Sequence, residues 1–153
     1  MLLLDRKGYK KKMKIALGSD HAGYEVKENI KKYLADQYSI IDFGTYGLDS
    51  VDYPEYGHKV AISISNNESD LGIVVCGSGI GISIAANKVK NARAALCTSV
   101  KHAEMSRRHN NANILAIGAR MTDYEQIISI IDKWLDTEFE GGRHQNRIDK
   151  IEL

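Results

Sequence analysis

Short apolar segments alternate with longer segments of helical periodicity along most of this chain. The segment Leu71–Cys76 is an unbroken apolar run, which is typical of a strand buried on both faces of a parallel sheet. Strands are predicted at residues 14–18, 39–43, 71–76, 94–97 and 113–118. Strands that are separated by helices predict an α/β fold, here a doubly wound, Rossmann-like α/β/α sandwich in three layers around a five-stranded parallel sheet.

Helices are predicted between these strands because apolar residues recur there at helical spacing. In the helix predicted at residues 24–36, the repeating residues are Val26, Ile30, Tyr33 and Leu34. Further helices are predicted at residues 55–67, about 80–88, 99–109, from 122 onward and about 143–151.

The helix near Thr122 has the clearest pattern. Thr122 and Glu125 match a capping box, and a wide apolar stripe follows them. The residues of this stripe are Ile127, Ile128, Ile131, Trp134 and Leu135. Ligands of doubly wound sheets bind at the carboxyl ends of the strands, near a topological switch point, so residues that directly follow a strand are the first candidates for function.

Composition narrows the classes of function. With 153 residues, the chain is long enough for one domain, which we place at residues 13–153. A formal net charge of +1 gives no general attraction to nucleic acid or membranes, and no apolar stretch is long enough to span a bilayer. Two cysteines and five histidines form no CxxC, HExxH or Cys/His pattern, so we expect no metal and a cytoplasmic location. Residues 1–12 are expected to be a poorly ordered extension rather than a signal peptide.

Cys76 ends a predicted strand and is followed directly by Gly77-Ser78-Gly79-Ile80-Gly81. The glycines let backbone N–H groups point at one spot, and the next helix adds positive dipole character, so this loop can hold an anion and favours a thiolate. Alternatively, Cys76 is a buried small residue and the glycines only tighten a turn. The loop matches neither a dinucleotide fingerprint, because Ile82 replaces the third glycine, nor a P-loop. A small anion such as an enediolate or a carboxylate fits better than a nucleotide.

Further polar residues follow a strand or close a helix. Asp20 and His21 can orient a substrate hydroxyl or support proton transfer, although Asp20 can equally cap the next helix. His109 closes a helix, whose C-terminus favours a protonated imidazole and hence a proton donor; the alternative is a helix-ending histidine without a role. No chemistry is expected of His58, His102 or His144.

Arginines form a candidate phosphate site. Arg143 and Arg147 are spaced i,i+4 near the start of the last predicted helix, where two guanidinium groups on one face can hold a phosphate. Arg120 follows the strand at residues 113–118 and is a further candidate anion contact. A solvated surface pair is the alternative, although arginines in the first turn of a helix favour an anion nearby.

These motifs occur together in one order along the chain. They are Gly18-Ser19-Asp20-His21-Ala22-Gly23, Asp52-Tyr53-Pro54, the segment from Cys76 to Lys88, Arg108-His109-Asn110 and Gly141-Gly142-Arg143-His144. From about Met13 to near its C-terminus, the chain resembles the type B ribose-5-phosphate isomerases, in the phosphosugar isomerase family that includes galactose-6-phosphate isomerase subunits. The resemblance implies interconversion of ribose 5-phosphate and ribulose 5-phosphate in the pentose phosphate pathway, without a metal or an organic cofactor. It also implies homodimers, often paired into tetramers, whose sites take residues from two subunits.

The resemblance further implies a role for each candidate residue. Cys76 would be the base that takes the proton from C2 and returns it at C1. The cis-enediolate oxygens would be held by Gly77, Ser78, Gly79, Ile80 and Gly81. His109 would assist opening of the furanose ring. Sugar hydroxyls would be held by Asp20, His21 and Asn110, and the phosphate by Arg120, Arg143 and Arg147.

Two positions bear on the branch of the family. Many members carry Thr where this chain has Ser78, and either hydroxyl can donate a hydrogen bond. Members without the cysteine use a glutamate at the position of Ile82, so a cysteine base fits this chain better than a carboxylate. Three other interpretations stay open at this point. They are a hexose-phosphate isomerase subunit, a non-catalytic phosphosugar-binding module and a nucleotide-binding domain.

Overall fold

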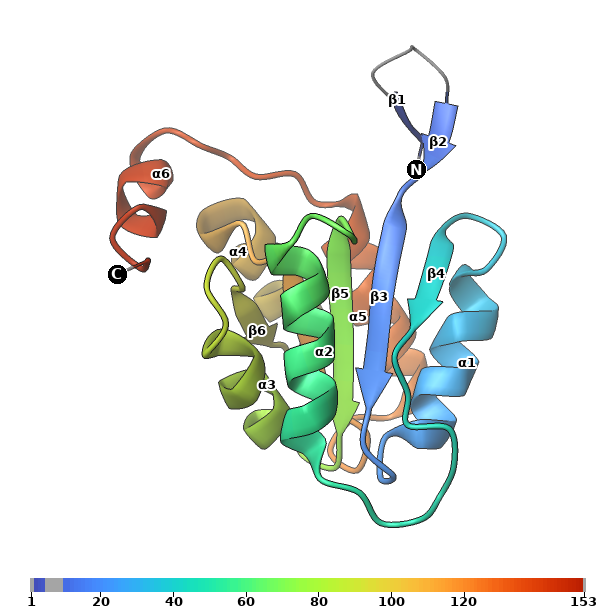
Figure 1. Cartoon of the computed structure of the whole chain (residues 1–153). Coiled ribbons are helices and arrows are strands. Elements are labelled where there is room, and N and C mark those ends of the chain that lie inside the picture. Colours follow the sequence, from blue (N-terminus) through green and yellow to red (C-terminus); the bar gives the residue numbers. More distant parts are fainter. Residues whose placement is uncertain (1, 5–9, 153) are drawn as a thin grey trace.

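A five-stranded parallel sheet forms the centre of the molecule, in the order β4-β3-β5-β7-β6 (Figure 1). The computed structural model describes residues 2–4 and 10–152. The strands of this sheet are β3 (Lys14–Ser19), β4 (Ser39–Asp42), β5 (Leu71–Cys76), β6 (Ala94–Leu96) and β7 (Ile114–Gly118). All neighbouring strands in it run parallel. With helices on both faces, this arrangement confirms the predicted three-layer sandwich.

The helices divide between the two faces of the sheet. On one face lie α1 (Tyr24–Leu34), α4 (Val100–Asn110) and α5 (Tyr124–Asp136); on the other lie α2 (Tyr53–Ser65) and α3 (Ile80–Asn87). The short α6 (Arg143–Ile148) lies outside these layers and contacts α4 (Figure 1). Each predicted helix is present. The largest difference at a helix end is in α6, which was expected to reach residue 151 and ends at Ile148.

The central strand β5 is buried along its whole length, as its apolar run predicts. A Cβ atom on Gly72 of this strand would lie only 2.6 Å from Cγ1 of Val60. Glycine therefore lets α2 pack directly against the sheet. β5 pairs with β3 on one side and with β7 on the other, which places Cys76 opposite Gly118 at the carboxyl edge of the sheet.

The start of α5 differs from the sequence prediction. Asp123 precedes the first helical residue and makes no side-chain capping hydrogen bond, so the capping box predicted for Thr122 and Glu125 is wrong. Glu125 is the second helical residue, whereas a capping box needs the glutamate at the third. Of the predicted apolar stripe, Ile127, Ile131 and Trp134 are buried, and Ile128 and Leu135 are partly buried. Ile130, which the prediction did not include, is buried with them.

The buried face of α1 also differs from the prediction. It consists of Lys27, Ile30 and Leu34, whereas Tyr33 is 40% exposed. Lys27 precedes Ile30 by three residues and Leu34 by seven, so a lysine occupies a position of the apolar stripe.

Near the N-terminus, β1 (Leu2–Leu4) and β2 (Lys10–Lys12) pair as an antiparallel ribbon that precedes β3. Residues 1 and 5–9 of the predicted extension lie outside the described residues. The expectation that residues 1–12 are poorly ordered and separate from a domain at 13–153 therefore stays a prediction. None of the described helices combines the length and the apolar character needed to cross a membrane.

The strand order creates a topological switch point between β3 and β5. From β3 the chain passes through α1 to β4 on one side, and then returns through α2 to β5 on the other side of β3. Because α1 and α2 cover opposite faces, the carboxyl ends of β3 and β5 meet at this switch point, which is where ligands of doubly wound folds bind.

Candidate active site

Cys76 is the last residue of β5, at this switch point, and is 4% exposed. The backbone N–H of Gly79 donates a hydrogen bond to its Sγ over 3.1 Å. The positive end of α3 begins at the next residue, Ile80. An amide donor and a helix N-terminus both favour a thiolate over a thiol. The sulfur is thus buried, as expected if Cys76 is a small core residue. It also faces the Gly79 amide, a group that stabilises an anion.

Gly79 is required by the shape of this loop. Its φ is +76°, a left-handed conformation that other residues rarely adopt, and a Cβ there would lie 2.6 Å from Cδ1 of Leu96 and 2.8 Å from the carbonyl carbon of Ile117. The turn therefore passes close against β6 and β7. Within it, the side-chain oxygen of Ser78 accepts a hydrogen bond from the N–H of Ile80 over 3.2 Å.

Tyr53 packs against the same loop. A Cβ on Gly81 would lie 2.5 Å from the Tyr53 ring, which is itself 41% exposed. Tyr53 is the first residue of α2, and Pro54 follows it in the first turn, where a proline is well tolerated. The tyrosine thus covers the outer side of the glycine loop.

Asp20 and His21 follow β3 and lie beside the end of β5. The N–H of Asp20 donates to the carbonyl of Val75 over 3.2 Å, which joins the start of this loop to the end of β5. Asp20 Oδ1 accepts a hydrogen bond from the N–H of Gly23 over 3.0 Å, a turn contact just before α1 that resembles the predicted cap. His21 Nδ1 accepts from the N–H of Val51 over 3.1 Å, so a neutral His21 carries its proton on Nε2 and can donate it to a ligand.

Arg120 completes the residues at the carboxyl edge. Its N–H donates to the carbonyl of Gly77 over 2.9 Å, and the preceding residue, Ala119, donates to the carbonyl of Cys76 over 2.8 Å. Its side chain is exposed and passes within ordinary contact distance of Gly77. We call the set at this edge the carboxyl-edge group. It consists of Asp20, His21, residues 76–81 and Arg120.

The other predicted site residues lie at the opposite edge of the sheet. α4 starts after the carboxyl end of β6 and runs back along the sheet for eleven residues, roughly 16 Å. Its last residue, Asn110, accepts through its carbonyl a hydrogen bond from Arg93, which directly precedes β6. α6 packs against this end of α4 (Figure 1). We call the set at this end the amino-edge group. It consists of His109, Asn110, Arg143 and Arg147.

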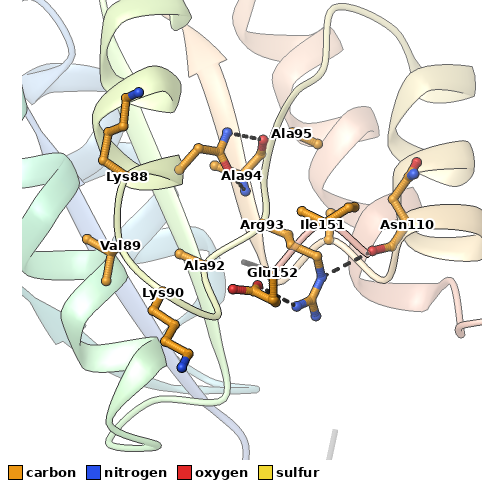
Figure 2. Close-up of a pocket in the computed structure, with 12 residues that line it drawn as sticks. Lys88, Val89, Lys90, Ala92, Arg93, Ala94, Ala95, Asn110, Ile151 and Glu152 are labelled. Atoms are coloured by element: carbon orange, nitrogen blue, oxygen red, sulfur yellow. Dashed lines mark hydrogen bonds and ion pairs between the residues drawn. The ribbon is translucent and has the colours of Figure 1, made fainter. Parts of the chain in front are cut away.

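Within the amino-edge group, Asn110, Arg143 and Arg147 are exposed. Asn110 also lines a cavity of about 580 Å³ between the end of α3, β6 and the C-terminal residues (Figure 2). Figure 2 shows Arg93 within this cavity, between Asn110 and Glu152. Cys76 is not among the lining residues. A single copy of the chain therefore presents two separated sets of predicted site residues.

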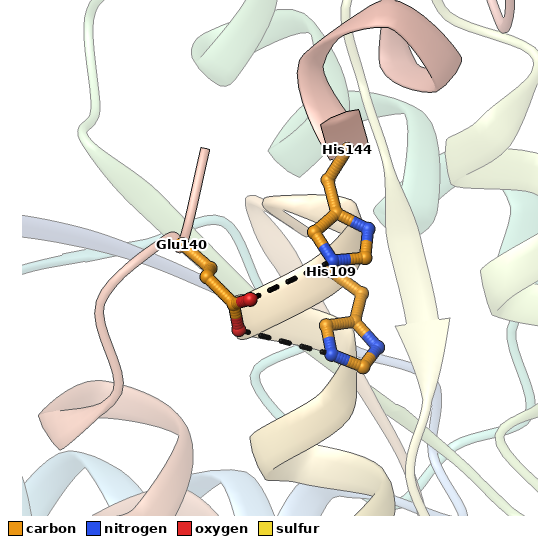
Figure 3. Close-up of side chains that lie close together, drawn as sticks. All are labelled: His109, Glu140 and His144. Atoms are coloured by element: carbon orange, nitrogen blue, oxygen red, sulfur yellow. Dashed lines mark ion pairs between the residues drawn. The ribbon is translucent and has the colours of Figure 1, made fainter. Parts of the chain in front are cut away.

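His109 has two neighbours that the sequence did not indicate (Figure 3). Its ring stacks on that of His144, with centroids 4.3 Å apart and planes 11° from parallel. Glu140 faces both rings, with carboxylate oxygens 4.0 Å from Nε2 of His109 and 3.9 Å from Nε2 of His144. Burial, together with the positive charges of His109, Arg143 and Arg147, lowers the pKa of His144 below its ordinary value of 6.5, although Glu140 opposes this shift. The only signal in the sequence for these two neighbours of His109 is the i,i+4 spacing of Glu140 and His144 across Gly141-Gly142.

Comparisons with known proteins identify the family and the fold of the chain. A family model described as Ribose/Galactose Isomerase matches residues 15–151. Ribose-5-phosphate isomerase B of Escherichia coli K12 is 44% identical over 90% of this chain and 93% of its own length. A solved ribose-5-phosphate isomerase B of Clostridium thermocellum is 54% identical with a TM-score of 0.90, covering 91% of this chain and 95% of that one.

A third relative carries a ligand. Ribose-5-phosphate isomerase B of Mycoplasma genitalium, solved with bound ribulose-5-phosphate, is 43% identical with a TM-score of 0.86, over 91% of this chain and 93% of that one. The resemblance indicated by the sequence motifs is confirmed by these matches, which cover nearly the whole chain from β3 onward. This chain belongs to the ribose/galactose isomerase family.

Proposed function

We propose that this protein is a cofactor-independent aldose–ketose isomerase that interconverts ribose 5-phosphate and ribulose 5-phosphate, within the pentose phosphate pathway. The observation that carries the proposal is the Gly79 amide, which donates to the Cys76 sulfur at the switch point of the sheet. The family match and the activities named for the relatives support the choice of substrate.

The proposed chemistry needs one base and donors for a developing oxyanion. In the open-chain aldose, the Cys76 thiolate takes the proton from C2, and the electrons of that bond pass to the carbonyl oxygen on C1. The resulting cis-enediolate is stabilised by N–H groups of residues 77–81, each oxyanion donor contributing about 10²–10³ in rate. Cys76 then returns the proton to C1, while the hydroxyl proton on O2 passes to O1, so that the C2 oxygen becomes the ketone and the C1 oxygen a hydroxyl. A positioned base contributes ~10²–10⁴.

The phosphate and the sugar ring need further groups. The Nε2 proton of His21 and the carboxylate of Asp20 suit sugar hydroxyls next to Cys76. Arg120 in the carboxyl-edge group and Arg143 and Arg147 in the amino-edge group suit a phosphate dianion. His109 would donate the proton that opens the furanose ring, with Asn110 beside it on a sugar hydroxyl.

One complete site therefore needs both groups, which a single copy holds at opposite edges of its sheet. We propose that two copies form a homodimer in which the carboxyl-edge group of one faces the amino-edge group of the other, and that dimers can pair further into tetramers. Each dimer would contain two such sites, related by its two-fold axis. A cytoplasmic location suits the proposal, because both cysteines are free and the reaction requires a reduced Cys76.

Replacement of Cys76 by alanine tests this function, with Cys97 as the matched control. Cys97 is also buried, but burial raises the pKa of its thiol, which donates to the carbonyl of Ala95 in β6 and to the hydroxyl of Ser106 in α4. We expect Cys76→Ala to lower turnover of ribose 5-phosphate by at least about 10²-fold, while the substrate still raises the melting temperature. Cys97→Ala should keep turnover within a few-fold.

A coupled assay over five- and six-carbon phosphosugars measures these rates and defines the substrate range. Unchanged turnover in Cys76→Ala would exclude the assigned base. Thermal stabilisation by NAD or ATP, but not by phosphosugars, would instead favour a nucleotide-binding domain.

A further inference from the structure

Three potential metal ligands meet beside the C-terminal end of α4. They are a ring nitrogen of His109, the carboxylate of Glu140 and a ring nitrogen of His144, and these ligand atoms all lie within 4.8 Å of one another. Figure 3 shows the Glu140 carboxylate facing both rings from one side. The three residues come from α4, from the segment after α5 and from the first turn of α6, so no spacing motif in the sequence joins all three.

His144 gives an independent indication of a missing ligand. Its side chain is 5% exposed, and its buried Nε2 has no hydrogen-bond partner. The nearest acceptor, Oε1 of Glu140, is 3.9 Å away, too far for a hydrogen bond. A buried polar atom without a partner is costly, and such atoms are rare in folded proteins. The unpartnered nitrogen is aimed at the other two ligands.

We propose that His109, Glu140 and His144 bind a divalent transition-metal ion, and that Zn²⁺ is the best match. Two imidazoles and one carboxylate are a ligand set that Zn²⁺ accepts, with a fourth position left to water. In a tetrahedral site with bonds of about 2.0–2.1 Å, ligand atoms lie roughly 3.3–3.4 Å apart. The 3.9 and 4.0 Å separations from Glu140 therefore need to close by about half an ångström, and the two ring nitrogens, which lie within 4.8 Å of each other, must also converge.

Solvent access and the neighbouring charged side chains determine how tightly this site binds a metal ion. The side chains of Glu140 and His109 are 46% and 37% exposed, which leaves an open side for the ion and its water. Against binding, Nη2 of Arg108 lies 3.0 Å from Oε2 of Glu140 and competes for that carboxylate. Arg143 and Arg147 on α6 add positive charge nearby. The site is thus an exchangeable one rather than a permanent structural centre.

Metal binding has a consequence for activity that rests on the proposed function. A Zn²⁺ ion on His109 occupies a ring nitrogen of the residue that would donate the proton for ring opening. It would also pull the two stacked rings together at their nitrogens and hold α6, with both of its arginines, against α4. Bound Zn²⁺ therefore inhibits the isomerase reversibly, and a chelator restores it.

Calorimetric titration of Zn²⁺ into the tag-free full-length protein tests the site directly. We expect Glu140→Gln and His144→Gln each to weaken binding at least about tenfold. Arg108→Gln should strengthen it, because it removes the cation that competes for Glu140. His102→Gln is the matched control, since His102 lies on α4 but pairs with Thr98, and it should leave binding unchanged. Equal affinity in all four variants, or no Zn²⁺ binding by the wild-type protein, would overturn the proposal.

A second probe separates this site from the two thiols. Co²⁺ bound by nitrogen and oxygen ligands should give visible bands without the near-ultraviolet charge transfer of a thiolate complex. A thiolate band that disappears in Cys76→Ala would place the metal at the other edge of the sheet and exclude the proposed ligands. The titrations do not depend on turnover, so a protein without isomerase activity would refute the proposed function and leave the metal site standing. An active wild-type enzyme that binds Zn²⁺ and keeps full turnover would refute the inhibition alone.

Discussion

At the scale of single residues, the glycine loop after β5 makes a sharp prediction for stability. Gly79→Ala places a Cβ in a left-handed conformation and within 2.6 Å of Leu96. We expect this strain to lower the free energy of unfolding by about 1–3 kcal/mol and to displace the N–H that donates to Cys76. Urea unfolding and turnover measure the two effects.

Gly77→Ala is the matched control in the same loop. A Cβ on Gly77 would meet its nearest neighbours, atoms of the Arg120 side chain, at 3.5 Å, which is an ordinary contact. The expected change in unfolding free energy is below about 1 kcal/mol. If the two variants unfolded at the same urea concentration, the left-handed conformation of Gly79 would not be the reason that glycine is needed at this position.

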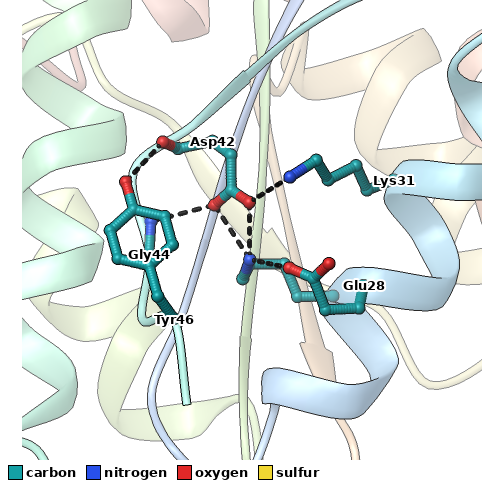
Figure 4. Close-up of polar contacts among 6 residues, drawn as sticks. Glu28, Lys31, Asp42, Gly44 and Tyr46 are labelled. Carbon is teal, nitrogen blue, oxygen red and sulfur yellow. Dashed lines mark hydrogen bonds and ion pairs between the residues drawn. The ribbon is translucent and has the colours of Figure 1, made fainter.

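At the scale of elements, a buried lysine of α1 forms an ion pair with an aspartate of β4. Nζ of Lys27 lies 2.8 Å from the Asp42 carboxylate, and the side chains are 1% and 9% exposed. Figure 4 shows Asp42 also facing Lys31 and the backbone of Gly44, whose N–H donates to Oδ1 over 2.9 Å. Gly44 in turn accepts from the N–H of Ser19 over 2.7 Å, so this cluster supports the loop that begins with Asp20.

Lys27→Met should therefore be strongly destabilising. It leaves the buried carboxylate of Asp42 without its closest cation, and removal of one partner from a buried pair typically costs about 3–5 kcal/mol. Lys31→Met is the control, because Lys31 contacts the same carboxylate from a side chain that is 42% exposed. Its expected cost is below about 1 kcal/mol. Equal losses of unfolding free energy in Lys27→Met and Lys31→Met, measured by urea unfolding, would contradict the larger contribution assigned to the buried Lys27.

The same carboxylate predicts a dependence of stability on pH. Burial alone would raise the pKa of Asp42, but hydrogen bonds from Lys27, Lys31 and Gly44 outweigh it and hold that pKa below the ordinary value of 3.8. Because the folded-state pKa is the lower one, this group stabilises the fold above about pH 4, and the contribution disappears as the pH falls through the folded-state pKa. Asp42→Asn should be less stable than wild type near neutral pH, and the gap should narrow in acid. If the difference in stability between Asp42→Asn and wild type widened in acid, the assigned direction of the Asp42 pKa shift would be wrong.

These elements also show how far the sequence could be used to predict the structure. The strands and the carboxyl-edge group were predictable, because apolar runs mark strands and parallel strands bring the residues after them to one edge. Lys27 was not predictable, since a polar residue in an apolar stripe is recognised only from its partner Asp42 on another element. The pairing of Glu140 with His109 was missed for the same reason. It depends on the path from α5 to α6, which no periodic pattern determines.

At the scale of the whole molecule, the separation of the two residue groups predicts complementation between inactive chains. In Cys76→Ala the amino-edge group is intact, and in His109→Asn the carboxyl-edge group is intact. If each site combines one group from each copy, a mixed dimer contains one site with both groups intact and one with neither. Random exchange makes about half of the dimers mixed, so activity should return to roughly a quarter of the wild-type value.

The control pairs two variants that damage the same group, Cys76→Ala and Asp20→Asn. Every site in their mixed dimer has a defective carboxyl-edge group, so the mixture should show no more turnover than the average of its components. Native mass spectrometry confirms the exchange of subunits in both mixtures. If mixed dimers of Cys76→Ala and His109→Asn form and turnover stays at the level of the separate variants, His109 cannot act across the interface. The single chain would then have to bring α4 and α6 to Cys76 by a rearrangement of roughly the length of α4. The packing of α4 against β6 and α5 makes such a rearrangement far more costly than the association of two copies.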